Sequence, residues 1–234
     1  MITVAIDTSC MTGGVAILDG ERLVAEYILS VRRTHSERLM SSLARAMEDA
    51  ELKPADIGLV SCCVGPGSFT GIRIGVASAK AMGMALGIRV APVTGLEALC
   101  YGLPAGERAF AMIDAKHGFC YAASFMCTGG APEPVMPPYY MGVEEIASEI
   151  ARGGVPHHMR GDGALAYAKE LSRMAGRLAV IPSPEDGVIR PSKVGLCGIR
   201  RHEAGGSVDP AVLEPSYVKR SEAEIKAGGK CSSC

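Results

Sequence analysis

This sequence lacks several features that would place a chain of 234 residues in a class at once. Its formal net charge is −1, so it has no basic excess of the kind that binds nucleic acid through the phosphates. No apolar run reaches the roughly 18 residues of a membrane span. The opening residues, MITVAIDTS, show no charged region followed by an apolar one, so we expect no secretory signal. We therefore expect a cytoplasmic protein with no membrane partner.

Cysteine, by contrast, is abundant, with nine residues scattered along the chain. In a protein that is not exported, reduced thiols in the core are the expected state. The last four residues are Cys231-Ser-Ser-Cys234. A zinc site would need further ligands, and a redox motif should open a helix, so we assign this pair no role.

Nearly half of the residues are hydrophobic (48%), and the first hundred alternate between strand and helix patterns. Residues 2–7 predict a strand, and Asp19-Gly20 predicts a hairpin with a type I′ turn, in which both central residues have positive φ. Apolar residues at helical spacing from Leu39 to Ala50 predict a helix, with Ser36 as N-cap. The continuous apolar run 57–65 is typical of a strand buried on both faces. A short helix capped by Thr94 follows another strand at 89–93, and the order suggests a mixed α/β domain.

The sequence partly restarts near Phe110. Residues 111–125 (AMIDAKHGFCYAASF) echo residues 4–18 (VAIDTSCMTGGVAIL), with Asp114 in the place of Asp7. The echo predicts a duplicated fold with a first lobe at 1–103, closed by 212–226, a second lobe at 104–211, and a loose tail at 227–234. The rest of the second half is less regular. It predicts a Pro/Gly-rich connection at 129–138, helices at 143–154 and 163–176, and a turn-rich stretch at 183–195 leading to a short segment that ends near Gly206.

The most unusual stretch is GPGSFTGIRIGVASAKAMGMALG, residues 65–87. Its first glycines have the spacing G-x-G-x-x-x-G, which fails the dinucleotide-binding pattern, and no Lys follows Gly71, so the P-loop pattern fails too. Pro66 has no N–H to donate to a phosphate. The segment is therefore not predicted to cradle a nucleotide.

Read as a helix, the same segment carries a glycine stripe, with small residues at every fourth position: Gly71, Gly75, Ala79, Gly83 and Gly87. Each interior glycine costs a helix about 1 kcal/mol relative to alanine, so the stripe needs an offsetting contact. Residues four apart share one face, which another backbone can approach closely. That backbone can belong to the chain's own sheet or to a second subunit, for which Phe69, Ile72, Met82 and Met84 would supply apolar anchors.

Seven motifs resemble the bacterial TsaB (YeaZ) family in order and spacing: AIDTS at 5–9, THSERL at 34–39, GPGSFTGIRIG at 65–75, AK at 79–80, PVTGLEAL at 92–99, IDAK at 113–116 and PSYVKR at 215–220. The resemblance covers residues 2 to about 220. Two departures are mild: the family usually has Asp-Ala-Arg where this chain has residues 114–116, and Leu-Arg where it has Val218-Lys219.

The resemblance implies the duplicated actin/Hsp70/sugar-kinase (ASKHA) fold, with two lobes of mixed sheet flanked by helices and a degenerate second lobe. It implies a non-catalytic dimerisation and assembly subunit in the synthesis of N6-threonylcarbamoyladenosine in tRNA. The implied partners are the catalytic paralogue TsaD, the ATPase TsaE and a second copy of the chain, with tRNA bound only through the complex. No cofactor of its own is implied; ATP/ADP and a metal belong to partner subunits or to their interface.

The resemblance also places the partner interface on the glycine-rich helix. The residues expected there are Gly65, Pro66, Gly67, Ser68, Phe69, Thr70, Gly71, Ile72, Arg73, Gly75, Ala79, Met82 and Gly83.

The catalytic paralogue holds its metal with His-x-x-x-His, where two imidazoles one turn apart share an ion. In this chain Gly95 and Leu99 stand in those places. The five histidines present show no such spacing, and no Ser/His/Asp context is visible, which argues against the peptidase label attached to the wider family. We therefore expect no metal site and no catalysis.

Asp7, Thr8 and Ser9 are candidates for a vestigial phosphate site, because kinases of this fold use an acid at the end of the first strand and hydroxyls in the following turn. The alternative is that Asp7 and Ser9 only cap the turn through bonds to the backbone. Asp114 carries the same two possibilities. The rival function is accordingly a small-molecule phosphotransferase.

Overall fold

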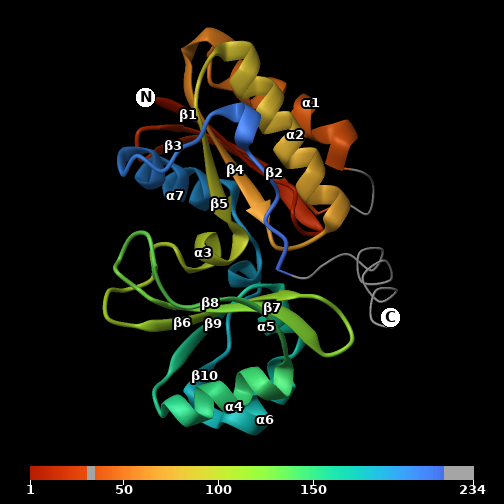
Figure 1. The fold of residues 1–234 in the computed structure, drawn as a ribbon, viewed down its shortest axis with the longest axis vertical. Coiled ribbons are helices and arrows are strands. Elements are labelled where there is room, and N and C mark those ends of the chain that lie inside the picture. Colours follow the sequence, from red (N-terminus) through yellow and green to blue (C-terminus); the bar gives the residue numbers. More distant parts are fainter. Residues whose placement is uncertain (31–34, 219–234) are drawn as a thin grey trace, which may run out of the picture.

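The computed structural model describes residues 1–30 and 35–218, without the side chains of residues 35–37. It contains two five-stranded mixed sheets, one in each of two lobes that lie end to end (Figure 1). Helices flank both sheets, which confirms the predicted α/β class with two lobes. In the described part of the chain, no helix is long and apolar enough to cross a membrane.

The first sheet has the order β3-β2-β1-β4-β5, with the first three strands antiparallel and β1, β4 and β5 parallel. Its strands are β1 Ile2–Asp7, β2 Thr12–Asp19, β3 Arg22–Ser30, β4 Ile57–Gly65 and β5 Val90–Thr94. In the β2–β3 turn Gly20 has φ 58°, whereas Glu21 is not among the residues with positive φ. The type I′ prediction is therefore wrong, and the turn follows the II′ pattern, which needs positive φ only at its first central residue.

The second sheet repeats the first strand for strand, in the order β8-β7-β6-β9-β10 with the same parallel and antiparallel pairs. Its strands are β6 Arg108–Asp114, β7 Phe119–Met126, β8 Glu133–Gly142, β9 His157–Arg160 and β10 Ala179–Val180. Asp7 ends β1 and Asp114 ends β6, so the sequence echo reflects a true duplication. The second copy is reduced, because β10 has only two residues.

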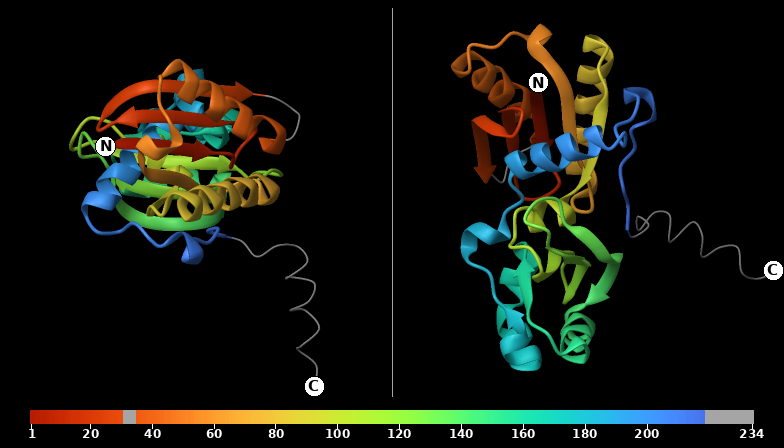
Figure 2. Two further views of the ribbon diagram at one scale, coloured as in Figure 1. Left: turned by 90° about the horizontal axis from the view of Figure 1, so that it is seen from above. Right: turned by 90° about the vertical axis from the view of Figure 1, so that its left-hand side faces the viewer.

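The helices of the first lobe lie on both faces of its sheet (Figure 2). Helices α1 (His35–Asp49) and α2 (Phe69–Leu86) cover the face that contains Val4 and Ile6, and α7 (Pro191–Glu203) covers the face that contains Ala5. Helix α3 (Gly95–Cys100) packs between the lobes. The second lobe has α4 Val143–Gly153, α5 Asp162–Ala166 and α6 Ala168–Ala175. Short 3-10 turns lie at η1 Pro54–Asp56, η2 Gly176–Leu178, η3 Pro184–Gly187 and η4 Pro210–Val212.

Helix α7 corrects the predicted boundary of the second lobe. We predicted 104–211 for that lobe, but α7 packs against all five strands of the first sheet. A Cβ at Gly195 would lie 2.3 Å from Leu18 Cδ1, and one at Gly198 would lie 2.0 Å from Ser61 Oγ, so these glycines permit a very close approach. The Ser61 hydroxyl also donates a hydrogen bond to the Val194 carbonyl. The chain therefore returns to the first lobe at α7, well before the predicted residue 212.

Other predictions in the second half also need correction. Part of the predicted Pro/Gly-rich connection is the edge strand β8, where prolines are tolerated because one side of the strand needs no partner. The predicted helix at 163–176 is two helices that meet at Tyr167. Helix α1 begins at His35, so the proposed N-cap Ser36 lies inside the helix; its side chain is not described. The residues beyond 218, with the pair Cys231/Cys234, lie outside what the structure describes.

The glycine stripe of α2 packs against the chain itself. A Cβ at Gly71 would lie 2.0 Å from the Thr8 carbonyl oxygen, and one at Gly75 would lie 2.5 Å from Thr8 Oγ1. At Gly83 it would lie 2.6 Å from Pro210 Cγ. Gly87 instead ends the helix in the left-handed conformation, with φ 66°. The sequence left open whether the stripe packs against the chain's own sheet or against a second subunit. In the structure it packs against the chain's own residues.

Helix α7 is also fastened to β3 through the carboxylate of Glu26, whose side chain is 5% exposed. The Arg190 guanidinium donates to Oε2 (Nε–Oε2 3.1 Å), and the Ser192 backbone N–H donates to Oε1 (2.8 Å). Burial alone would raise the pKa of Glu26, but these hydrogen bonds outweigh it and lower the pKa.

The close packing of α2 predicts that substitution by leucine is destabilising on its inner face and nearly neutral on its outer face. Gly75→Leu should lower the free energy of unfolding by about 3 kcal/mol or more, because the new side chain meets Thr8. Ala77→Leu, on the exposed face of the same helix, should change it by less than about 0.5 kcal/mol. Urea unfolding followed by circular dichroism measures both. Equal stability of the two variants would show that the stripe does not pack on the sheet.

The Glu26 contacts predict a pH-dependent contribution to stability. Glu26→Gln should cost about 1–3 kcal/mol at pH 7, since it removes the charge from these bonds. A carboxyl with a lowered native pKa stabilises fully above its ordinary value of 4.5 and loses this effect as the pH falls through the native pKa. The two proteins should therefore converge in acid. Glu21→Gln, which breaks an exposed pair with Arg200, is the control and should cost under about 1 kcal/mol.

Candidate functional site

The turn after β1 and the loop after β4 form one hydrogen-bonded unit. The Ser68 N–H donates to the Ser9 carbonyl (2.6 Å), and the Thr8 hydroxyl donates to the Gly71 carbonyl (2.7 Å). Gly67 has φ 151°, and a Cβ there would lie 2.2 Å from the Ser9 carbonyl oxygen. The glycines of this loop therefore serve contact between two backbones rather than contact with a phosphate.

Asp7, Thr8 and Ser9 are each at most 1% exposed. Asp7 Oδ1 accepts hydrogen bonds from the Ser9 backbone N–H (3.0 Å) and from the Ser9 hydroxyl (2.7 Å). These are the turn-capping bonds that the sequence offered as the alternative to a phosphate site. With the three side chains buried in the turn, a ligand phosphate has no open surface there.

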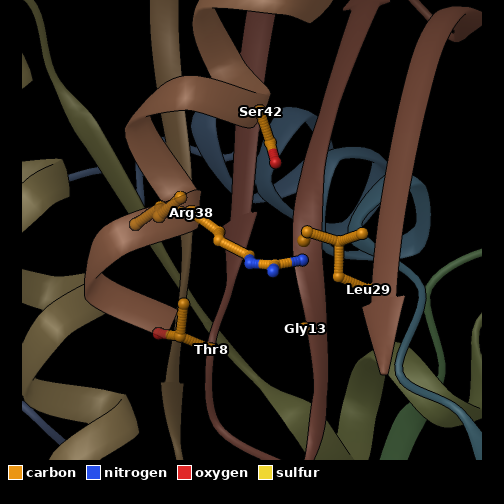
Figure 3. A pocket seen from close by; sticks show the side chains of 7 residues that line it. Thr8, Gly13, Leu29, Arg38 and Ser42 are labelled. Atoms are coloured by element: carbon orange, nitrogen blue, oxygen red, sulfur yellow. The ribbon is translucent and has the colours of Figure 1, made fainter. Parts of the chain in front are cut away.

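The cavity nearest this turn is too small for a nucleotide. It has a volume of about 10 Å³, room for about one water molecule. The Arg38 side chain leaves α1 and extends toward Gly13 of β2 and Leu29 of β3, across the space above Thr8 (Figure 3). The site does not resemble an adenosine pocket, which needs several hundred Å³.

Two carboxylates of the second lobe meet at the corresponding position. Asp162, at the start of α5, accepts a hydrogen bond from the Asp114 backbone N–H (3.0 Å). Asp114 in turn accepts hydrogen bonds from the Lys116 N–H (2.8 Å) and the Tyr167 hydroxyl (3.1 Å). Burial raises the pKa of Asp162; for Asp114 the bonds from Lys116 outweigh burial and lower the pKa. Asp162 was not predicted as a site residue, because a Gly-Asp pair before a short helix has no distinctive spacing in the sequence.

The two lobes bring their acids toward one thiol. Burial raises the pKa of Cys10, and the charges of Asp162 and Asp7 raise it further. The other buried cysteines of the described residues, Cys62, Cys63, Cys100, Cys120, Cys127 and Cys197, are reduced thiols. Within the described part of the chain, no three His, Cys, Asp or Glu side chains are arranged to hold a metal ion.

Helix α3 fills the space where the paralogue's histidines would stand. Thr94 caps it as predicted, with Glu97 completing a capping box. A Cβ at Gly95 would lie 2.7 Å from Ile189 Cδ1, and Leu99 is 3% exposed. Both belong to the apolar core between the lobes, where imidazole ligands and an ion would have no polar surroundings.

The predicted interface residues fall into two groups. Gly65, Pro66, Gly71, Ile72, Gly75, Ala79 and Gly83 are buried within the chain. In the single chain these residues pack inward, and their place in a partner interface stays a prediction. The surface retains Gly67, Ser68, Phe69, Thr70, Arg73 and Met82, which are exposed or half-buried.

Three exposed residues at the start of α2 and the end of the described chain form a cluster. The Arg73 guanidinium lies 3.7 Å from the centroid of the Phe69 ring, and its Nε donates to the Tyr217 hydroxyl (3.0 Å). The Ser216 N–H donates to the Val64 carbonyl, so residues up to 218 run beside the first lobe.

An apolar groove runs between α1 and α2 on the outer side of the first lobe. We call it the methionine groove; its volume is about 300 Å³, and it is lined by Met40, Leu43, Ala44, Met47, Pro54, Ile57, Met82, Ala85 and Leu86. Met40 of α1 is 50% exposed, and Met82 of α2 is half-buried. Sequence reasoning missed the contribution of α1, although Met40 directly follows a residue of its apolar face.

Comparisons with known proteins agree on one family. The family model described as "TsaD: tRNA N6-adenosine threonylcarbamoyltransferase" matches residues 22–174. The tRNA threonylcarbamoyladenosine biosynthesis protein TsaB of Bacillus subtilis is 29% identical over 231 residues, 97% of each chain. The tRNA N6-adenosine threonylcarbamoyltransferase of Brucella anthropi is 34% identical over 105 residues, 36% of this chain and 29% of that protein.

A solved structure confirms the fold. YeaZ from Pseudomonas aeruginosa matches with a TM-score of 0.80 and 22% identity, covering 92% of this chain and 99% of that one. The family model spans well over half of the chain, and the TsaB match spans nearly all of it. The chain belongs to the family that this model describes and, within it, to the TsaB (YeaZ) proteins.

Proposed function

We propose that this chain is a non-catalytic assembly subunit in the synthesis of N6-threonylcarbamoyladenosine in tRNA, and that it binds and supports the catalytic subunit TsaD. Membership of the TsaB family gives the pathway. The observation that carries the assembly role is the methionine groove, an apolar surface between two helices that includes the exposed Met40 of α1 and the half-buried Met82 of α2.

The chemistry of the groove suits a protein partner. Apolar surface of this kind on a folded domain marks an interaction site when it is continuous. Methionine side chains adapt their shape to the partner and are favoured at such surfaces. The outer face of α2 beside it carries Ala77, Ala81 and Ala85, all exposed, which lets a partner helix approach.

The same groove is proposed to bind TsaD and a second copy of the chain, so the two complexes compete. TsaE joins the complex with TsaD. Nucleotide, metal and tRNA are held by partner subunits or at their interfaces, and the assembly works in the cytoplasm. The hydrocarbon around Gly95 and Leu99 supports a non-catalytic role. A phosphotransferase finds less support, because Asp7, Thr8 and Ser9 are buried in their own turn.

A charge in the groove should break the complex. Met40→Glu should weaken binding to TsaD by about 30-fold or more, the effect of losing a buried anchor and desolvating a carboxylate. Val180→Glu introduces the same charge at an exposed apolar residue of the second lobe and should leave binding unchanged. Calorimetric titration measures the affinity, and thermal unfolding confirms that both variants fold. Wild-type affinity in folded Met40→Glu would remove the groove from the interface.

The catalytic role is tested separately. The purified chain alone should transfer no threonylcarbamoyl group from threonylcarbamoyl-AMP to tRNA, because no described residues form the metal site that the paralogue uses. The readout is the modified nucleoside, measured by mass spectrometry, with TsaD and TsaE added as the positive control. Product formation by the chain alone, lost in Asp7→Ala, would make it an enzyme.

A further inference from the structure

The second lobe contains a cavity that the assembly role does not use. It is lined by residues of the second sheet and of the C-terminal end of α4, whereas the methionine groove is lined by residues of the first lobe. Its volume is about 480 Å³, within the range of small-molecule sites. It is lined by Arg108, Phe110, Ser124, Val135, Met136, Glu149, Arg152, Gly153 and His157.

The register of the sheet explains how these residues meet. Arg108 pairs with His157 on β9, and two residues further along β6 Phe110 pairs with Ser124, which in turn pairs with Met136. Paired residues of neighbouring strands share a face, so the two rows project to the same side. Helix α4 ends beside these rows at Gly153, with Gly154 as its left-handed cap, and its last turn lines the cavity.

Two polar side chains are buried in the wall of the cavity. His157 is 6% exposed and Ser124 is 8% exposed. His157 Nδ1 lies 2.9 Å from the Val155 carbonyl oxygen, so this nitrogen carries the proton and Nε2 is left as an acceptor. The Ser124 hydroxyl makes no hydrogen bond within the described part of the chain, and its oxygen is not among the buried unpaired atoms of the described residues, so it is open to the cavity and can bind water or a ligand.

One positive charge in the cavity is uncompensated. Arg152 is paired with Glu149, so these two charges cancel. Arg108 is half-buried, and within the described part of the chain its guanidinium makes neither an ion pair nor a hydrogen bond. Burial lowers the pKa of His157, and the charge of Arg108 lowers it further, so the imidazole adds no second positive charge at pH 7.

We propose that this cavity is a binding site for a small organic carboxylate with an apolar or aromatic body. The planar guanidinium of Arg108 pairs with the carboxylate through two hydrogen bonds, a geometry that arginine favours. The Ser124 hydroxyl donates to the same group, and the apolar body lies against Phe110 and Met136. A single unpaired cation matches a monoanion better than the double charge of a phosphate monoester. This proposal does not depend on the proposed assembly function.

Benzoate and benzamide test the proposal on the unaltered chain, because they have similar shape and differ in charge. In a protein labelled with ¹³C at the methionine methyls, benzoate should shift the Met136 signal in a saturable way and leave that of Met84 on α2 unchanged. Benzamide should bind about tenfold more weakly or worse. The proposal is overturned if benzoate causes no saturable shift at millimolar concentration, or if the two probes bind equally.

Variants test whether Arg108 is the residue that recognises the charge of the carboxylate. Arg108→Gln should weaken benzoate binding about tenfold or more and abolish the preference over benzamide, and Arg108→Lys should restore part of it. Arg177→Gln, at an exposed arginine of the same lobe, is the control and should bind benzoate like the wild type. Unchanged benzoate affinity in Arg108→Gln would refute the site. If that variant does not fold, the comparison of the two probes still decides.

Discussion

The contact between the backbone of the β1–β2 turn and the N-terminal half of α2 is the constraint on which the first lobe depends. The Thr8 and Ser9 carbonyls lie where side chains at Gly71 and Gly67 would otherwise project. The same contact aligns Thr8 to bond Gly71 and Ser68 to bond Ser9, so the turn, the loop and the helix hold one another. It also fixes which side of α2 faces outward. Met82, Ala85 and Leu86 of α2, together with residues of α1, then form much of the methionine groove.

The junction between the lobes is a second consequence of small residues at close contacts. Gly95 allows Ile189 and Ile113 to meet α3, and the resulting apolar core joins residues of β4, β6, β7 and α7. Hydrocarbon occupies the space between the lobes next to α3, and the charges of Asp162 of the second lobe and Asp7 of the first both raise the pKa of Cys10.

Much of the fold could be predicted from residue patterns, and the exceptions have physical causes. The strand at 2–7, the glycine-rich helix, the cap at Thr94 and the duplication are local or repeated signals, and all occur. The glycine stripe predicts a close approach but not the identity of the neighbour, since spacing says nothing about which backbone arrives. Helix α7 was missed because Gly195 and Gly198 weaken its pattern, yet those glycines are what fits it to the sheet. The sequence did not predict the cavity of the second lobe, because Arg108, Ser124 and His157 belong to three different strands. They come together only through the register of the sheet.

The position of α7 has a consequence for the order in which the protein forms. All five strands of the first sheet precede residue 95, but one face of that sheet, with Ala5, Leu18 and Leu59, is covered by Leu196 and Ile199. During translation the five strands and helices α1 and α2 emerge first. The second lobe is then synthesised before α7, the helix that covers the remaining face of the first sheet. The nascent first lobe therefore carries an open hydrophobic face for the time needed to translate about a hundred residues, a period in which a chaperone or early contact with the second lobe protects it from aggregation.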